Sequence, residues 1–181
     1  MAHLAPSITA LTDLGARFAD AGHDLALVGG PVRDALLGRA VSDVDFTTSA
    51  RPDETEALLA AWGTATWDMG REFGTIGARR GDMVVEVTTY RADAYDGQTR
   101  KPIVAFGDSL EDDLVRRDFT VNAMALRLPD LTFVDPHGGL ADLEDQVLRT
   151  PSAPEVSFGD DPLRMMRAAR FVAQLAFVPT P

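Results

Sequence analysis

The chain has 181 residues, of which 45% are hydrophobic and 25% are charged, and this is the composition of an ordinary globular protein. That length fits one full domain, or one domain and the start of another. No apolar run approaches the roughly 18 residues that a membrane span needs. Because the sequence lacks cysteine and a signal-peptide pattern, disulfides and thiolate metal sites are excluded and a cytoplasmic location is expected.

The net charge of −11 bears on the class of partner, because 17 basic residues stand against 28 acidic ones. A surface that grips RNA usually carries a basic patch. Two interpretations stay open at this point. Either RNA is not the partner, or the RNA-binding surface lies in sequence outside this chain.

The N-terminal third of the sequence predicts alternating helices and strands. Ser7 can cap a first helix that ends at Gly22, and Pro31 suits the first turn of a second helix that ends at Gly38. The other elements expected here are strands at Leu25–Val28 and Val44–Thr47 and a helix at Pro52–Ala61.

Hairpins dominate the next part of the chain, with turn pairs at Gly81-Asp82 and Pro129-Asp130. The elements expected are strands at Thr64–Trp67, Thr75–Arg79, Met83–Thr88, Leu126–Leu128 and Leu131–Val134, a loop over Ala92–Gly107 and a final helix over Asp161–Leu175. Because hairpins outnumber strand–helix–strand units, the sequence predicts an α+β fold with a mixed or antiparallel sheet.

Acidic residues on two predicted strands mark a candidate metal site. Asp43 and Asp45 stand at i and i+2 in SDVDF, and in a strand this spacing places both carboxylates on one face. Such a pair is often a solvated strand end, but it can also hold Mg²⁺, which prefers few protein carboxylates together with phosphate oxygens. Glu86 lies opposite the flanking Val85 and Val87, either as a solvent-facing carboxylate or as a third acid beside the pair.

Gly29 and Gly30 follow a predicted strand and open a helix, where bare backbone N–H groups can meet a phosphate. Arg33, in the first turn, can add a charge-assisted contact. The alternative is a simple tight turn in which Arg33 pairs with Asp34. The spacing of neither a Walker A loop nor a dinucleotide fingerprint is present.

Arginines gather in two further places, each beside an acid (Asp118 and Asp161). They are Arg116, Arg117, Arg164, Arg167 and Arg170. The last three recur every third residue, so on a helix they fall within an arc of about 120°. A solvated face is the usual explanation for such a stripe, although arginines with an acid can also read nucleobase edges and triphosphate oxygens.

Six motifs follow one another along the chain: GGPVRD (29–34), DVDF (43–46), EVTTYR (86–91), RRDFTVNA (116–123), DPHGG (135–139) and DPLRMMRAARF (161–171). In their order they resemble the family of class II CCA-adding tRNA nucleotidyltransferases and bacterial poly(A) polymerases, from about Leu25 to the end. The resemblance implies a polymerase-beta-like nucleotidyltransferase head over residues 1–150, with a mainly antiparallel mixed sheet and helices on one side. Residues 151–181 would begin a helical neck. One departure is Asp160-Asp161, where the family often has Glu-Asp.

The resemblance also implies a metal-dependent transfer of CMP and AMP from CTP and ATP to the 3′-hydroxyl of tRNA. It assigns Mg²⁺ to Asp43 and Asp45, with Glu86 at the position of a third acid. It assigns Asp161 and Arg164 to reading the base. The other implied nucleotide contacts are Gly29, Gly30, Arg33, Arg116, Arg117, Asp118, Asn122, Arg167 and Arg170.

The segment Ala92–Gly107 bears on which enzyme of the family this is. Asp96 and Arg100 have the D-x-x-x-R spacing that resembles the flexible loop associated with adding the terminal A. This favours a CCA-adding or A-adding enzyme, while poly(A) polymerase stays open because the head motifs are shared. Two non-enzyme alternatives are an inactive nucleotide-binding module, which the retained aspartates argue against, and an acidic interaction domain, which leaves the ordered motifs unexplained.

In this family the resemblance places tRNA-binding regions after the neck, beyond Pro181. We therefore expect the 181-residue chain to bind nucleotides but to bind tRNA poorly. The apolar residues of the final helix are expected to be exposed and to favour self-association. They are Leu163, Met166, Phe171, Val172 and Leu175.

Overall fold

The computed structural model describes residues 8–41, 44–94 and 103–180. Its helices are α1 (Ile8–Asp20), α2 (Gly30–Leu36), α3 (Pro52–Trp62), α4 (Leu110–Val115), α5 (Gly139–Glu144), α6 (Pro154–Asp160) and α7 (Leu163–Leu175). Its strands are β1 (Leu25–Val28), β2 (Val44–Thr48), β3 (Ala65–Trp67), β4 (Thr75–Arg80), β5 (Met83–Thr89), β6 (Arg91–Ala94), β7 (Ile103–Phe106), β8 (Ala125–Leu128), β9 (Thr132–Val134), β10 (Val147–Leu148) and β11 (Val178–Pro179).

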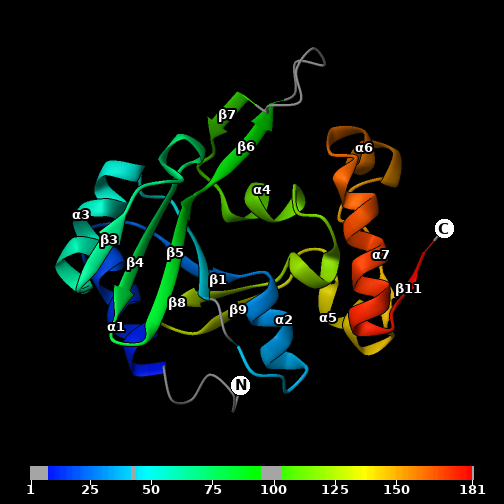
Figure 1. Ribbon diagram of the computed structural model, residues 1–181, viewed down its shortest axis with the longest axis horizontal. Coiled ribbons are helices and arrows are strands. Elements are labelled where there is room, and N and C mark those ends of the chain that lie inside the picture. Colours follow the sequence, from blue (N-terminus) through cyan, green and yellow to red (C-terminus); the bar gives the residue numbers. More distant parts are fainter. Residues whose placement is uncertain (1–7, 42–43, 95–102, 181) are drawn as a thin grey trace.

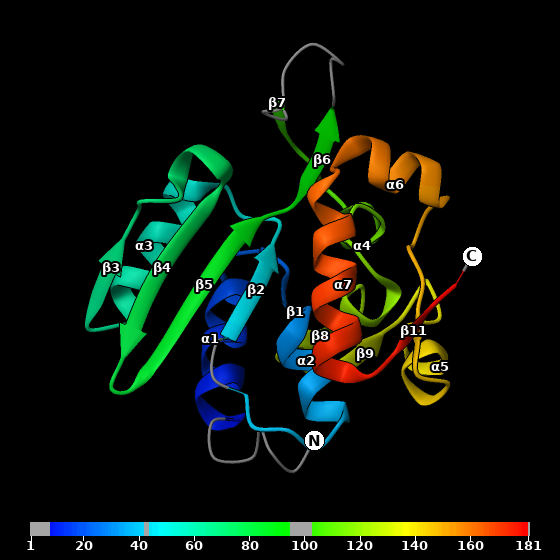
Figure 2. The ribbon, with the colours of Figure 1, turned by 45° about the vertical axis from the view of Figure 1, so that its right-hand side comes forward.

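Seven strands form the main sheet, in the order β3-β4-β5-β2-β1-β8-β9. Within the described residues β2 and β5 are its one parallel pair, and its other neighbours are antiparallel. The expected α+β fold with a mixed, mainly antiparallel sheet is therefore confirmed. Figures 1 and 2 show β3 and α3 at one end of the molecule, with α6 and α7 towards the other.

The main hydrophobic core lies between one face of this sheet and the helices α1 and α3. It includes Leu14 and Phe18 of α1, Leu59 of α3 and Leu27 of β1. Because side chains alternate along a strand, Ala26 and Val28 of the same β1 point to the opposite face, where they pack against Leu110 and Leu114 of α4. β1 is thus buried on both faces, and α4 adds a helix on the side that the sequence left uncovered.

Two expectations about local structure need correction. The segment Ala92–Gly107 was expected to be a loop, but its two ends form the antiparallel pair β6–β7, with Arg91 opposite Phe106. This segment has no clear alternation of apolar and polar residues, which is the pattern from which a strand is predicted. The short helices α4, α5 and α6 were also missed. For α4 a signal exists, because Ser109 caps the helix by accepting a bond from the Asp112 backbone N–H.

The final helix, α7, begins at Leu163 and packs onto the head. Phe171 and Leu175 were expected to be exposed, but both are buried in the main core. Leu163, Met166 and Val172 are exposed, as expected. After α7 the chain returns as β11, which pairs in parallel with β10. Residues 151–180 therefore share one core with the residues before them.

The helices in the described parts of the chain are all too short or too polar to cross a lipid bilayer.

Candidate active site

Two carboxylates stand side by side on the sheet face that also carries α4. Asp45 of β2 pairs in register with Glu86 of β5, and both side chains are exposed. Their neighbours Phe46, Val85 and Val87 point into the core on the other face. Directly opposite residues on adjacent strands lie close enough for both carboxylates to share one ligand. Asp43, the other predicted metal-binding acid, lies outside the described residues.

The turn between β1 and α2 brings backbone close to the same region. Gly29 has φ 73° and ψ −136°, a conformation that is essentially restricted to glycine. Arg33 follows one turn later and forms a two-pronged ion pair with Asp34. Its Nη1 atom also donates to the Asn122 side-chain oxygen at 2.6 Å. The expected pairing of Arg33 with Asp34 is thus present. Arg33 also lines a cavity that is described below.

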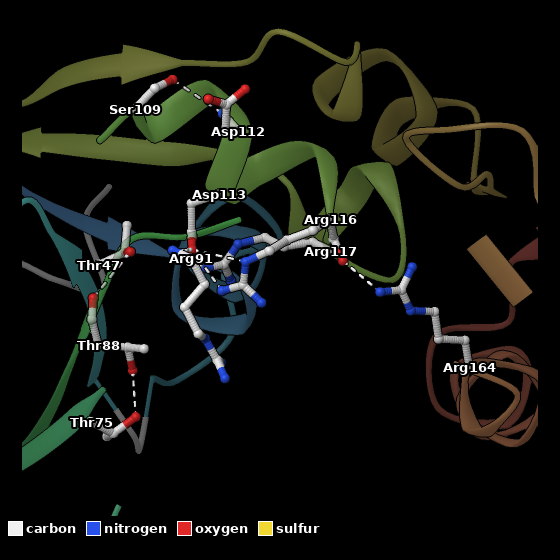
Figure 3. Close-up of polar contacts among 10 residues, drawn as sticks. All are labelled: Thr47, Thr75, Thr88, Arg91, Ser109, Asp112, Asp113, Arg116, Arg117 and Arg164. Atoms are coloured by element: carbon white, nitrogen blue, oxygen red, sulfur yellow. Dashed lines mark hydrogen bonds and ion pairs between the residues drawn. The ribbon is translucent and has the colours of Figure 1, made fainter. Parts of the chain in front are cut away.

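A buried carboxylate, Asp113 of α4, holds the two arginines that follow this helix. Its Oδ1 accepts from Arg116 at 2.6 Å and its Oδ2 accepts from Arg117 at 2.9 Å, while the side chain is 0% exposed. Oδ1 also accepts from the Arg91 backbone N–H. Figure 3 shows Asp113 pointing towards the guanidinium groups of Arg116 and Arg117.

Opposing effects set the pKa of Asp113. Burial alone raises the pKa of this carboxyl, but the charges and hydrogen bonds of Arg117 and Arg116 outweigh burial and hold the pKa below its usual value. The carboxylate is therefore ionised and fixes both arginines. Sequence reasoning missed Asp113. The available signal was an acid three and four residues before two arginines, a spacing that favours contact on a helix.

Asp118 connects the head to α7. Its Oδ1 accepts from the Phe119 backbone N–H and from the Asn122 side-chain amide, and its Oδ2 pairs with Arg167 at 2.7 Å. Asn122 in turn accepts from Arg33. One carboxylate thus ties α2, the segment after α4 and the first half of α7 into a single polar network.

The arginine stripe of α7 is only partly solvated, because Arg164 is buried whereas Arg167 and Arg170 are exposed. Arg164 is only 7% exposed and donates to Ser157 and to the Arg116 backbone oxygen. Arg167 pairs with Asp118, and Arg170 lies over the Phe171 ring at 5.0 Å. Asp161 precedes the helix and accepts from the Leu163 backbone N–H.

These groups line one open cavity of about 510 Å³ between the head and α7. Its lining residues are Gly29, Gly30, Arg33, Asp45, Arg116, Arg117, Asp118, Asn122, Asp161, Arg164, Arg167, Arg170, Phe171 and Gln174. Phe171 and Gln174 were not predicted. Glu86 lines two smaller adjoining cavities, each of which it shares with Asp45. Asp96 and Arg100, the predicted loop pair, lie outside the described residues.

A strand-borne acid, a glycine turn and clustered arginines thus surround one cavity, and Glu86 borders the two cavities beside it. The chain belongs to the family of the poly A polymerase head domain, whose family model matches residues 25–149. The resemblance that the six motifs indicated is thereby confirmed.

Several curated relatives share the name CCA-adding enzyme. The chain is 45% identical over 157 residues to the CCA-adding enzyme of Geobacillus thermodenitrificans, which covers 86% of this chain and 38% of that protein. It is 44% identical over 163 residues to the CCA-adding enzyme of Bacillus subtilis, covering 90% and 40% respectively. The chain therefore spans about two fifths of the length of these relatives.

Solved structures agree with these relationships. The Bacillus stearothermophilus CCA-adding enzyme in complex with CTP matches with a TM-score of 0.84 and 37% identity, over all of this chain and 42% of that one. A tRNA nucleotidyltransferase complexed with a primer tRNA and an incoming ATP analogue matches with a TM-score of 0.76 and 36% identity, over 92% of this chain and 46% of that one.

Proposed function

We propose that this chain is the catalytic head of an enzyme that adds CMP and AMP, taken from CTP and ATP, to the 3′-hydroxyl of tRNA. The observation that carries the proposal is the cavity in which four of the six motifs meet, because its lining combines Asp45, a glycine turn and seven arginines or acids of the motifs at 116–123 and 161–171. The relatives named as CCA-adding enzymes support CCA addition over poly(A) synthesis.

The proposed reaction is attack of the tRNA 3′-hydroxyl on the α-phosphorus of the bound nucleotide, with release of pyrophosphate. It needs no covalent enzyme intermediate. Arg116 and Arg117 lie where they can neutralise charge on the triphosphate, and Asp113 keeps both guanidinium groups in place. Asp161 and Arg164, at the start of α7, are proposed to contact the edge of the base.

The acids fit a divalent metal ion. Among residues 8–41, 44–94 and 103–180, no group of three or more His, Cys, Asp or Glu side chains gathers to hold a metal. Two neighbouring carboxylates, Asp45 and Glu86, suit Mg²⁺, which takes few protein ligands and completes its shell with water and phosphate. We propose that Asp43 and Asp45 hold Mg²⁺, with Glu86 as a further acid. When bound, the metal lowers the pKa of the attacking hydroxyl and offsets triphosphate charge.

The direct test has two stages. The chain should first bind CTP and ATP in a Mg²⁺-dependent manner, measured by calorimetry with and without EDTA. A protein that carries this head together with the remaining length of its relatives should then transfer labelled CMP and AMP to a tRNA that lacks its CCA end. Failure to bind either nucleotide, or transfer that survives removal of divalent metal, would overturn the proposal.

The segment with Asp96 and Arg100 is proposed to favour addition of the terminal A. Arg100→Ala should then reduce AMP transfer more than CMP transfer, because we propose that this segment assists the rearrangement between the two bases. Equal loss of both activities would contradict this role.

A further inference from the structure

Arg164 is held by two elements that the motif analysis did not connect with it. Its Nη1 donates to the hydroxyl oxygen of Ser157 on α6 at 2.8 Å, and its Nη2 donates to the backbone oxygen of Arg116 at 2.6 Å. Figure 3 shows the second bond, with the Arg164 side chain reaching from α7 to the end of α4. Ser157 is 0% exposed, so its hydroxyl is fully removed from water.

Two anchors from different elements fix the plane of the guanidinium group. A guanidinium has five N–H donors in a rigid, flat fork, so two bonds to separate nitrogens define its orientation. Arg164 also lines the main cavity, and these two bonds use two of the five N–H donors of its guanidinium group. Recognition of a base edge depends on the direction of such donors, because a donor tilted away from the edge forms a poor hydrogen bond.

We propose that Ser157 is a positioning residue that sets nucleobase selectivity through Arg164. The inference rests on the proposed function, since it assumes that Arg164 faces a base. Ser157 itself is not part of the cavity lining, so it acts only through the arginine. The Arg116 oxygen is the second anchor, and it links base selection to the segment that carries the two proposed phosphate-binding arginines.

A serine suits this position for a specific reason. Its hydroxyl oxygen accepts a bond from a charged donor inside the protein, where an unpaired donor is costly. In Ser157→Ala the Arg164 Nη1 loses its acceptor at a buried position, and the guanidinium is left with the Arg116 oxygen alone. The fork can then rotate about that one bond, and its remaining donors no longer match one base edge better than another.

The test measures binding of CTP, ATP, GTP and UTP to the 181-residue chain with Mg²⁺ by calorimetry. All four nucleotides carry the same triphosphate, so a loss of general binding lowers every affinity alike, whereas misorientation of Arg164 changes their ratios. We expect Ser157→Ala to reduce the preference for CTP and ATP over UTP and GTP by roughly tenfold. Ser152→Ala is the matched control. Ser152 lies just before α6 and, like Ser157, outside the cavity lining, so this variant should leave the ratios unchanged.

Two further variants separate positioning from packing. Ser157→Thr keeps the hydroxyl and should restore selectivity. Arg164→Ala should lose selectivity by itself, and the double variant Ser157→Ala/Arg164→Ala should lose no more, because the two residues act as one unit. If Ser157→Thr does not fold, as judged by its thermal melting curve, this double-variant cycle decides the question.

The outcomes distinguish the two levels of the proposal. Selectivity that is unchanged in Ser157→Ala, or losses that add in the double variant, would overturn the role of Ser157 and leave the proposed function standing. Absence of Mg²⁺-dependent nucleotide binding in the unaltered chain would overturn both.

Discussion

At the scale of single residues, Asp45 and Asp113 are carboxylates in opposite environments. Asp45 is exposed near the start of the central strand β2, next to Glu86 on the neighbouring strand. Asp113 is enclosed and paired with two arginines. An exposed acid contributes little to stability, whereas an enclosed and paired one cannot be removed without leaving its partners uncompensated. The two residues therefore predict opposite patterns of activity and stability.

Asp45→Asn should abolish nucleotide transfer in a protein that carries this head, while the free energy of unfolding changes by no more than about 1 kcal/mol. The substitution removes charge from the proposed metal site and leaves core packing intact. Asp82→Asn, an exposed acid at the β4–β5 turn, is the control and should retain full activity. Substantial transfer by an Asp43→Asn/Asp45→Asn double variant at millimolar Mg²⁺ would refute the metal assignment.

Asp113→Asn should lower the free energy of unfolding by about 3 kcal/mol at pH 7, because it breaks a buried ion pair. The folded state holds the pKa of Asp113 below its unfolded value. Its stabilising contribution is therefore present above the unfolded pKa, which is about 3.9, and is lost as the pH falls through the lower folded pKa. Denaturant unfolding of both proteins between neutral pH and about pH 3 measures this. A difference that stays constant on acidification would contradict the ionised pair.

At the scale of elements, the β1–α2 turn contains two glycines with different roles. The backbone conformation requires Gly29, whereas Gly30 leaves room in the cavity. Gly29 has a positive φ of 73°, and a Cβ there would meet Arg117 Nη1 at 3.2 Å. A Cβ on Gly30 would meet nothing closer than Arg33 Nη2 at 3.6 Å, an ordinary contact distance. Both glycines line the cavity, but only the first is demanded by the backbone.

Gly29→Ala should therefore destabilise the chain by about 1–3 kcal/mol, because alanine must adopt a backbone conformation that it avoids. Gly30→Ala should leave the melting temperature nearly unchanged and should weaken nucleotide binding, because its methyl group enters the cavity. Thermal melting and calorimetric CTP binding of the two variants test this pair. Equal destabilisation by both substitutions would show that the turn is constrained as a whole.

At the scale of the whole molecule, Phe171 joins α7 to the head. Its ring packs edge-on against Phe119 at 5.7 Å between centroids. Three cations surround the same ring, because Arg33, Arg167 and Arg170 lie 5.0–5.7 Å from its centre. We propose a division into a head (1–150) and the start of a neck (151–181), and this contact shows that the two parts depend on one another.

Phe171→Ala should lower the free energy of unfolding by about 3–5 kcal/mol, the usual cost of removing a buried aromatic ring. It should also weaken CTP binding, since the arginines of α7 lose the surface against which they are arranged. Met166→Ala, on the same helix but 71% exposed, is the control for both measurements. A Phe171→Ala protein of unchanged stability would mean that α7 is not docked on the head in solution.

The negative net charge of the chain predicts weak binding of RNA. With a net charge of −11, and with six of its 17 basic residues lining the cavity, the 181-residue chain should bind tRNA weakly. Binding of a tRNA without its CCA end, measured at low and at moderate salt, tests this expectation. Tight and salt-sensitive binding would show that this chain alone holds an RNA-binding surface.

The sequence by itself determined the strands of the main sheet, the faces of those strands and the longer helices α1, α3 and α7. Alternation placed Glu86 opposite Val85 and Val87, and it predicted hairpins and hence a mainly antiparallel sheet. These features depend on local periodicity and on turn residues, which are written in neighbouring positions of the chain. The ordered motifs likewise contain every residue of the cavity lining except Gln174, although Phe171 was not among the expected nucleotide contacts.

Only the tertiary structure decided which of the cavity's charged side chains are hydrogen-bonded or ion-paired, and with which partners. Periodicity described Arg164, Arg167 and Arg170 as one helix face, but Asp118, which pairs with Arg167, lies 49 positions away in the sequence. Whether a charged side chain faces water or a buried partner depends on the path of the chain between them, and a local pattern carries no record of that path. For the same reason the anchoring of Arg164 by Ser157 and the Arg116 oxygen emerges only when α4, α6 and α7 are packed together.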